Sequence, residues 1–313
     1  MSSPTDASFN PFERFAMVST ATSAGFVAAP AAQLKNSHGA TSTALAIGAG
    51  RTGSTAIRRH SSKGCSAAGS SEGHQGLVEK YKSPEEPEWP LRLIIVGHNP
   101  SDTAWQQGHY YANPSNRMYK LLATAKIIPV GFTASDDDRC PITCGVGFTD
   151  VGFSIPGTVS SEFKKTDLHT WREGFFKRLK AHAERAAATA ALSERGKEEG
   201  AEPAESAACG YPKIVAFAGK RQWEELFYDA STTAKAQTRG GKNGTFRFGL
   251  QPAMLRPPGW PFPSERTEVF VVPSSSGAAA MTTAARTEPY IELGRRLQEM
   301  DAWDRTSSTA AVS

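Results

Sequence analysis

The sequence lacks the features that mark several classes of protein. It has no run of 18 apolar residues, so it predicts no membrane-spanning helix. Its four cysteines, Cys65, Cys140, Cys144 and Cys209, are too few for a disulfide framework and favour a reducing compartment. Cys140 and Cys144 form a CxxxC pair, but no further His or Cys completes a zinc or iron–sulfur site. We therefore expect no metal and no other cofactor.

Acidic residues are scarce in residues 1–85, where the first three are Asp6, Glu13 and Glu72. Ser, Ala, Thr and Gly dominate this segment, and it shows no apolar periodicity. Such a composition cannot bury enough apolar surface to offset the entropy of the chain, so we expect disorder. Two interpretations stay open: an organellar transit segment, which is typically poor in acids, or a disordered basic tail.

Beyond this segment, four apolar runs rich in β-branched residues predict strands: Leu91–Val96, Val146–Val151, Lys213–Ala218 and Glu268–Val272. Helical patterns lie between and after them, at Met118–Ala125, Asp167–Glu184, Arg221–Phe227 and Tyr290–Met300. Strands that alternate with helices indicate an α/β fold with three layers (α/β/α) and a short, mainly parallel central sheet. Ligands of such sheets bind beyond the carboxyl ends of the strands.

The domain boundaries follow from composition. We expect a folded domain over residues 86–303 and a flexible C-terminus over 304–313. Within the domain, residues 186–210 are rich in Ala, Glu, Ser and Gly and predict a surface insertion. The formal net charge of +4 permits a polyanionic partner without requiring one.

Two of the predicted strands end in polar loops. After the first strand comes Gly97-His98-Asn99-Pro100, where Pro100 restricts Asn99 to an extended conformation. The carboxamide of Asn99 is thereby presented in a defined direction and can orient a water or polarise a carbonyl. After the fourth strand comes the hydroxyl-rich loop Pro273–Ala279, which suits phosphate oxygens.

Several short motifs, in order along the chain, resemble the mismatch-specific uracil/thymine-DNA glycosylase family, within the uracil-DNA glycosylase superfamily. They are GHNPS (97–101), HYYANPSNRMYKLL (109–122), GVGFTD (145–150), FAGK (217–220), FGLQP (248–252) and VPSSSGAAA (272–280). The Ser-Ser-Ser form is closer to the eukaryotic thymine-DNA glycosylase branch. The resemblance covers about Trp89 to Met300 and leaves out the N-terminal segment.

The resemblance implies a monofunctional DNA glycosylase that hydrolyses the N-glycosidic bond of uracil, with thymine as a second candidate, and initiates base-excision repair. Its partner would be double-stranded DNA with a pyrimidine mispaired with guanine, and the base would have to leave the stack first. We expect a monomer in the nucleus, or alternatively in the mitochondrion or chloroplast through the N-terminal extension.

The resemblance also suggests roles for residues. Asn99 matches the family's catalytic asparagine, which positions the attacking water, and Tyr111 lies where the family stacks an aromatic ring on the flipped base. Gly97, His98 and Asn116 complete the expected base pocket, although His98 either contacts a base oxygen or only packs. Lys220 is a candidate phosphate contact or simply a solvated lysine.

Two positions depart from the family's pattern. Asp150 stands where thymine-DNA glycosylases have an asparagine. It could serve as a general base or stabilise positive charge on the sugar, or it could be only a helix N-cap or a solvated loop acid. Ala278 replaces the arginine that fills the hole left by the flipped base, so we expect weaker flipping and better action on uracil than on thymine. The remaining members of the expected DNA-contacting loop are Ser274, Ser275, Ser276, Gly277, Ala279 and Met281, the last as a substitute wedge.

Two alternatives remain. The chain could be a non-catalytic DNA-binding protein on the same fold, because a fold does not guarantee an activity. It could also be a broader uracil glycosylase that prefers single strands. A nucleotide-dependent oxidoreductase is set aside, because no GxGxxG turn follows the first predicted strand.

Overall fold

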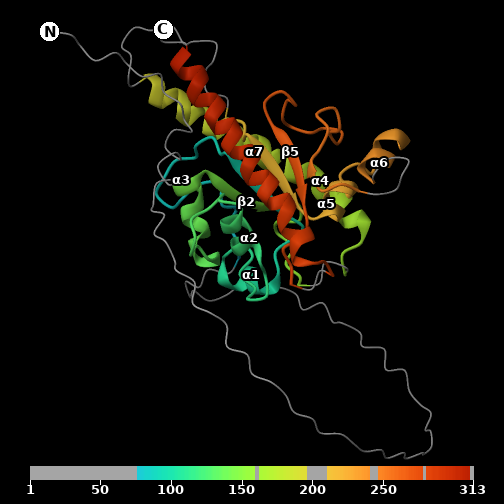
Figure 1. Cartoon of the computed structure of the whole chain (residues 1–313). Helices are drawn as coiled ribbons and strands as arrows, with labels where there is room; N and C mark the ends of the chain where they lie inside the picture. The colour runs from blue at the N-terminus through green and yellow to red at the C-terminus, as the bar shows by residue number, and fades with distance from the viewer. Residues whose placement is uncertain (1–75, 159–161, 196–209, 240–245, 278–279, 311–313) are drawn as a thin grey trace, which may run out of the picture. The chain divides into compact units, whose positions relative to one another are not determined.

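The structure is a computed structural model, and it describes residues 76–158, 162–195, 210–239, 246–277 and 280–310. Figure 1 shows the arrangement of the helices and strands. In chain order they are β1 (Leu93–Gly97), α1 (Asp102–Gln107), α2 (Met118–Thr124), the 3-10 helix η2 (Ala134–Arg139), α3 (Cys140–Cys144), β2 (Val146–Asp150), α4 (Lys165–Arg195), β3 (Ile214–Ala218), α5 (Lys220–Glu225), α6 (Thr232–Thr238), β4 (Gly249–Leu250), β5 (Glu268–Val272) and α7 (Thr283–Ala310).

The strands form one sheet in the order β2-β1-β3-β5-β4. The first four are parallel, and β4 pairs with β5 in the antiparallel direction. The four strands predicted from the sequence are confirmed, each within two residues of its expected start. The two-residue strand β4 was not predicted, because so short a segment shows no periodicity.

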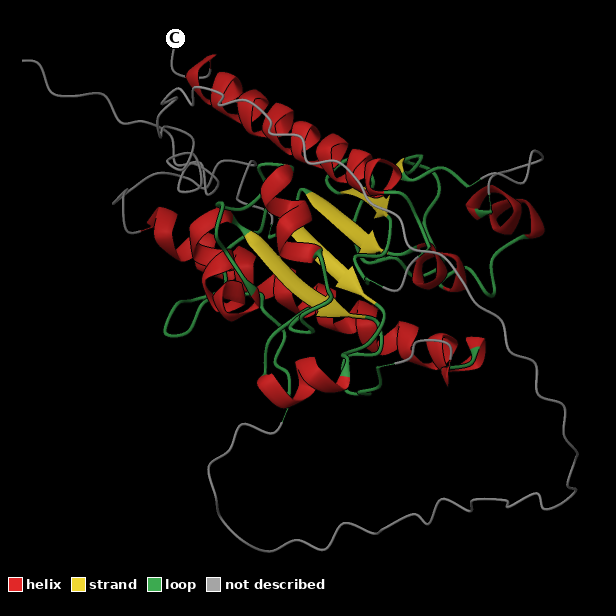
Figure 2. Cartoon of the chain, turned by 60° about the horizontal axis from the view of Figure 1, so that its bottom comes forward, coloured by secondary structure: helices red, strands yellow, loops and turns green. Residues whose placement is uncertain are grey.

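Helices cover both faces of the sheet, as Figure 2 shows. Leu93 and Ile95 of β1 belong to a core cluster with residues of α2, α3 and α7, whereas Ile94 and Val96 belong to a second cluster with residues of α4 and α5. Burial on both faces explains why β1 is a continuous apolar run rather than an alternating one. The predicted three-layer α/β/α fold is confirmed.

Helix α4 differs from the prediction at its C-terminal end. It was expected to end at Glu184, with an insertion over 186–210, but it continues to Arg195. Ala186 and Ala190 are fully buried, so the first part of the predicted insertion packs against the domain. Alanine is the strongest helix former and fits a close contact, which composition alone does not reveal. Residues 196–209 of the predicted insertion lie outside the described residues.

The described structure extends into both ends that were predicted to be flexible. Leu77 and Tyr81 are buried, and Lys80 forms an antiparallel bridge with Phe148 of β2, so the packed domain begins before residue 86. This short segment covers the edge of β2, which a composition average over 85 residues cannot detect. Residues 1–75 of the predicted disordered extension lie outside the described residues.

At the other end, α7 extends to Ala310, into the segment 304–313 that was expected to be flexible. No glycine or proline follows Gly294 within this helix to stop it. Among the described residues, no helix combines the length and the apolar character that a membrane span requires.

Candidate functional site

The centre of the candidate site is the contact between the ends of β1 and β2. Gly97 and Asp150 are register partners there, and the pairing continues beyond the strands, where Val151 N–H donates to the Gly97 carbonyl at 3.1 Å. A Cβ atom on Gly97 would lie 1.9 Å from Oδ1 of Asp150 and 3.1 Å from the hydroxyl oxygen of Tyr111. Only glycine leaves room for this approach. The structure thus brings three of the predicted site residues together at one point.

Asp150 is a buried acid. Its residue is 3% exposed, which excludes the alternative of a solvated loop acid. Burial, and then the negative charge of Glu79, raise the pKa of Asp150 to about 7, while the positive charge of Arg178 works in the opposite direction. A carboxyl group with a pKa near neutral pH can take up and release a proton under physiological conditions, as a general base requires.

Glu79 and Arg178 form an ion pair beside Asp150. Arg178 Nε donates to Oε1 of Glu79 at 2.9 Å, and Arg178 Nη2 donates to the backbone carbonyl of Asp150 at 2.6 Å. Thr149, the residue before Asp150, also donates its hydroxyl to Glu79. Sequence reasoning missed both members of the pair. Arg178 was detectable in principle, because it follows Phe175 by three residues on the apolar stripe of α4, where a charge needs a partner.

Tyr111 is a half-buried residue whose hydroxyl oxygen is buried, and that oxygen has no hydrogen-bond partner among the described residues. Its backbone is left-handed, with φ at 57°. The ring packs edge-on against Phe148 of β2, with 6.1 Å between the centroids. This arrangement anchors the hydroxyl end inside the domain, while the residue as a whole stays half-buried.

The side chain of Asn99 is held by a loop. Its Nδ2 lies 3.0 Å from each of three backbone carbonyl oxygens, those of Pro100, Ile155 and Gly157. Its Oδ1 lies 2.7 Å from Nδ1 of His98, which must be the donor because an amide oxygen only accepts. The amide group is therefore oriented by the loop that follows β2, and one lone pair of Oδ1 is left for a water molecule.

His98 packs among aromatic rings. Its ring centroid lies 5.8 Å from that of Phe163 and 5.8 Å from that of Trp171. Burial lowers the pKa of His98, so the ring is neutral at pH 7 and keeps Nδ1 protonated toward Asn99. These contacts favour the packing alternative for His98 over a contact with a base oxygen.

The serine-rich loop lies against the loop that follows Tyr111. The carbonyl of Ser275 accepts from Arg117 N–H at 2.9 Å, and a Cβ on Gly277 would lie 2.8 Å from the carbonyl oxygen of Ser115. Within the serine loop, Ser274 Oγ accepts from Ser276 N–H at 3.3 Å. The two loops predicted to hold a base and its phosphates are thus neighbours.

The other predicted site residues have different surroundings. Asn116 Oδ1 accepts from Met118 N–H at 2.9 Å, so this side chain caps helix α2. Lys220 Nζ lies 3.3 Å from Glu224 Oε1, so its charge already has an acidic partner. Met281 is 37% exposed, whereas Ala278 and Ala279 lie outside the described residues.

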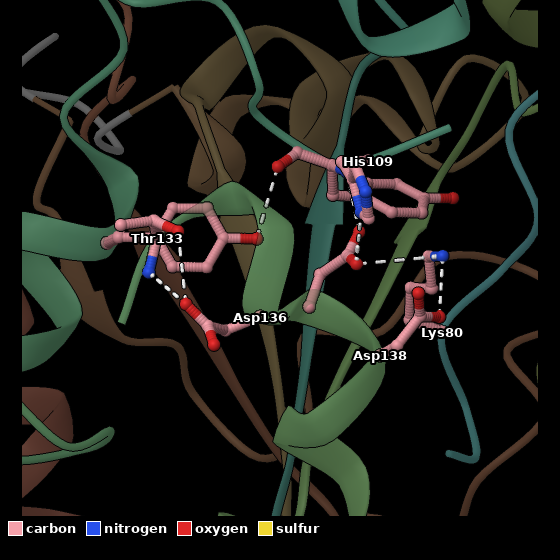
Figure 3. A network of polar contacts seen from close by, with 8 residues as sticks. Lys80, His109, Thr133, Asp136 and Asp138 are labelled. Carbon is pink, nitrogen blue, oxygen red and sulfur yellow. Dashed lines mark hydrogen bonds and ion pairs between the residues drawn. The ribbon is translucent and has the colours of Figure 1, made fainter. Parts of the chain in front are cut away.

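One group of side chains in the described residues has a spacing that suits a metal ion: His109, Asp137 and Asp138. Lys80 lies among them, with its Nζ 2.7 Å from Asp138 and 3.6 Å from Asp137, and Figure 3 shows this lysine beside the carboxylates. The ammonium group thus supplies the positive charge at this position. Cys140 and Cys144 are free thiols and are buried.

Comparisons with known proteins identify a family and a relative of this chain. The family model described as the Uracil DNA glycosylase superfamily matches residues 84–298. A G/U mismatch-specific uracil DNA glycosylase of Schizosaccharomyces pombe (strain 972) is 27% identical over 190 residues, which cover 60% of this chain and 44% of that relative. The matched region is therefore less than half of the relative's length.

The ion pair beside Asp150 leads to a testable prediction. Glu79→Gln removes a negative charge that raises the pKa of Asp150, so we expect this pKa to fall below its wild-type value near 7. A carbon-13 NMR titration of aspartate carboxyl groups, with Asp150 assigned by substitution, measures it. Glu88→Gln is the matched control, because Glu88, like Glu79, accepts from an arginine but does not contribute to the pKa shift of Asp150. An unchanged titration in Glu79→Gln would contradict the prediction.

Proposed function

We propose that this chain, which belongs to the uracil DNA glycosylase superfamily, is a monofunctional DNA glycosylase that hydrolyses the N-glycosidic bond of uracil mispaired with guanine. The observation that carries the proposal is the meeting of Gly97, Tyr111 and the buried Asp150 at the carboxyl end of the parallel sheet. The Schizosaccharomyces pombe relative is a G/U mismatch-specific uracil DNA glycosylase, which supports the choice of substrate. Removal of the base would be the first step of base-excision repair.

Binding would begin with the target base outside the duplex. Leaving the stack costs a few kcal/mol, and the cost is smallest for a mispaired base. The ring of the half-buried Tyr111 is the proposed stacking surface. Such a contact contributes about 1–3 kcal/mol per base. The glycine at position 97 leaves the space that the Asp150 carboxyl occupies, and so fixes where the sugar would meet this carboxyl.

Asp150 is the proposed general base. In its ionised form it accepts a proton from a water molecule whose oxygen attacks C1′ of the sugar, while the C1′–N1 bond breaks and its electron pair leaves with the base. The carboxylate also stabilises positive charge that develops on the sugar. Asn99 cannot accept that proton at neutral pH, because an amide is too weak a base, so its proposed role is to orient the water through Oδ1.

The proposed substrate range follows from Ala278, which stands where the family has the arginine that fills the hole left by the flipped base. Alanine at position 278 is too short to fill the space of a flipped nucleotide, so extrusion from a duplex would depend on the weakness of the pair itself. We therefore propose that uracil opposite guanine is a better substrate than thymine opposite guanine. The same reasoning makes a preference for single strands the second candidate within the enzyme class.

A lesion panel tests the function. Purified full-length protein is incubated with labelled oligonucleotides that carry uracil or thymine opposite guanine, or uracil in a single strand, and abasic sites are measured at one salt concentration. We expect excision from G·U duplexes at a rate above that from G·T. Faster excision from the single strand would favour the broader uracil glycosylase. Binding of G·U DNA without any abasic product would favour the non-catalytic DNA-binding protein.

The different roles proposed for Asp150 and Asn99 give a second prediction. Asp150→Asn removes the general base and should lower the single-turnover rate by roughly 10²–10⁴-fold. Asn99→Ala keeps the base and should leave measurable activity. Asp136→Asn, on the separate helix η2, is a control for the removal of an aspartate charge. Equal losses in the two site variants, or no loss in Asp150→Asn, would reject Asp150 as the base.

A further inference from the structure

Asp137 connects helix η2 to the loop that carries Tyr111. The residue is fully buried. Its Oδ2 accepts from the backbone N–H of Tyr110 at 2.8 Å, and its Oδ1 pairs with Nδ1 of His109 at 2.8 Å. Lys80 lies 3.6 Å from Asp137 and partly balances its charge, and Figure 3 shows Lys80 beside Asp138 in this network.

The other backbone group of Tyr110 is also held by a side chain. The hydroxyl of Tyr119, on helix α2, donates to the Tyr110 carbonyl oxygen at 3.1 Å. The Tyr110 ring stacks on Phe148 of β2, with 5.9 Å between the centroids. The peptide groups on both sides of Tyr110 are therefore fixed by residues 9 and 27 positions away in the chain.

This double anchor lies directly before Tyr111, whose φ of 57° is unfavourable for a residue with a side chain. Such a conformation persists only where the surroundings impose it, and it occurs preferentially at functional sites. If the backbone of Tyr110 were free to relax, Tyr111 would return to negative φ, and its ring would turn away from Gly97 and Asp150.

We propose that Asp137, together with Tyr119, is a positioning residue that holds Tyr111 in its left-handed conformation and thereby aims the ring at the extruded base. This inference rests on the proposed function for its effect on catalysis. It assigns to a buried acid outside the catalytic centre a role in substrate binding rather than only in the stability of the fold.

The neighbouring Asp136 provides a matched control within the same helix. Its carboxylate accepts from Thr133 N–H at 2.9 Å and from Arg139 at 3.1 Å. Neither of these hydrogen bonds involves residues 109–111. Asp136→Ala thus removes an aspartate with comparable hydrogen bonds one position away. Tyr119→Phe is the mild variant, because it removes a single hydroxyl and keeps the packed ring.

A double-mutant cycle separates positioning from general stability. We measure kcat and KM for excision of uracil from a G·U duplex in Asp137→Ala, Tyr119→Phe, Tyr111→Ala and the two doubles with Tyr111→Ala. We expect KM to rise roughly tenfold or more in Asp137→Ala and by less in Tyr119→Phe, as when a base loses a stacking partner. On the Tyr111→Ala background both effects should disappear, because coupled residues are not additive. Asp137→Asn, which keeps an acceptor for Tyr110 N–H, should restore most of the affinity.

The inference would be overturned if the increases in KM caused by Asp137→Ala or Tyr119→Phe were fully additive with that of Tyr111→Ala in the double variants. It would also be overturned if Asp136→Ala raised KM as much as Asp137→Ala does. If Asp137→Ala does not fold, the cycle with Tyr119→Phe decides alone. If the wild-type protein excises no base, the proposed function fails, and a crystal structure of Tyr119→Phe then tests the inference separately. A Tyr111 that leaves the left-handed region supports the anchor, and an unchanged Tyr111 overturns it.

Discussion

The site depends on one close contact, in which the Asp150 carboxyl occupies the space where any residue but glycine at position 97 would carry its Cβ. The parallel register of β1 and β2 creates this contact, because it places Gly97 opposite Asp150 at the last step of the ladder. The carboxyl is thereby shielded from bulk solvent, and this burial together with the charge of Glu79 raises the pKa of Asp150 to about 7. The proposed catalysis needs this position and this proton affinity together.

Two side-chain networks flank the contact: one affects the charge of Asp150, and the other affects the position of Tyr111. Successive residues of a strand point to opposite faces, so Thr149 reaches the pair formed by Glu79 and Arg178, while Asp150 faces the layer of Tyr111. The pair on the α4 side acts on the charge of Asp150. The network of Asp137 on the other side acts on the placement of Tyr111. The charge of Asp150 and the position of Tyr111 can therefore be altered by separate substitutions.

The strands and the layer order were predictable, because continuous apolar runs followed by polar loops mark buried parallel strands. Asp150 was singled out because it departs from the pattern of the family that the chain resembles. The surroundings of Asn99 were not predictable, because two of the three carbonyls that its amide contacts belong to the loop after β2 and depend on how that loop folds back. Asp137 lies 26 residues after Tyr111 in an irregular segment, where no periodicity links the two. Glu79 was missed because its short packed segment adjoins a long polar one. Contacts between distant loops leave no local pattern in the chain.

The most direct test of the central contact is single-turnover excision of uracil from a G·U duplex by Gly97→Ala. The added methyl group would lie 1.9 Å from Oδ1 of Asp150, so the carboxyl must move while the strand keeps its pairing. We expect a folded protein, judged by circular dichroism and thermal unfolding, whose rate falls by roughly a hundredfold or more, as for a misplaced catalytic group. A folded Gly97→Ala protein that excises uracil at the wild-type rate would contradict the account.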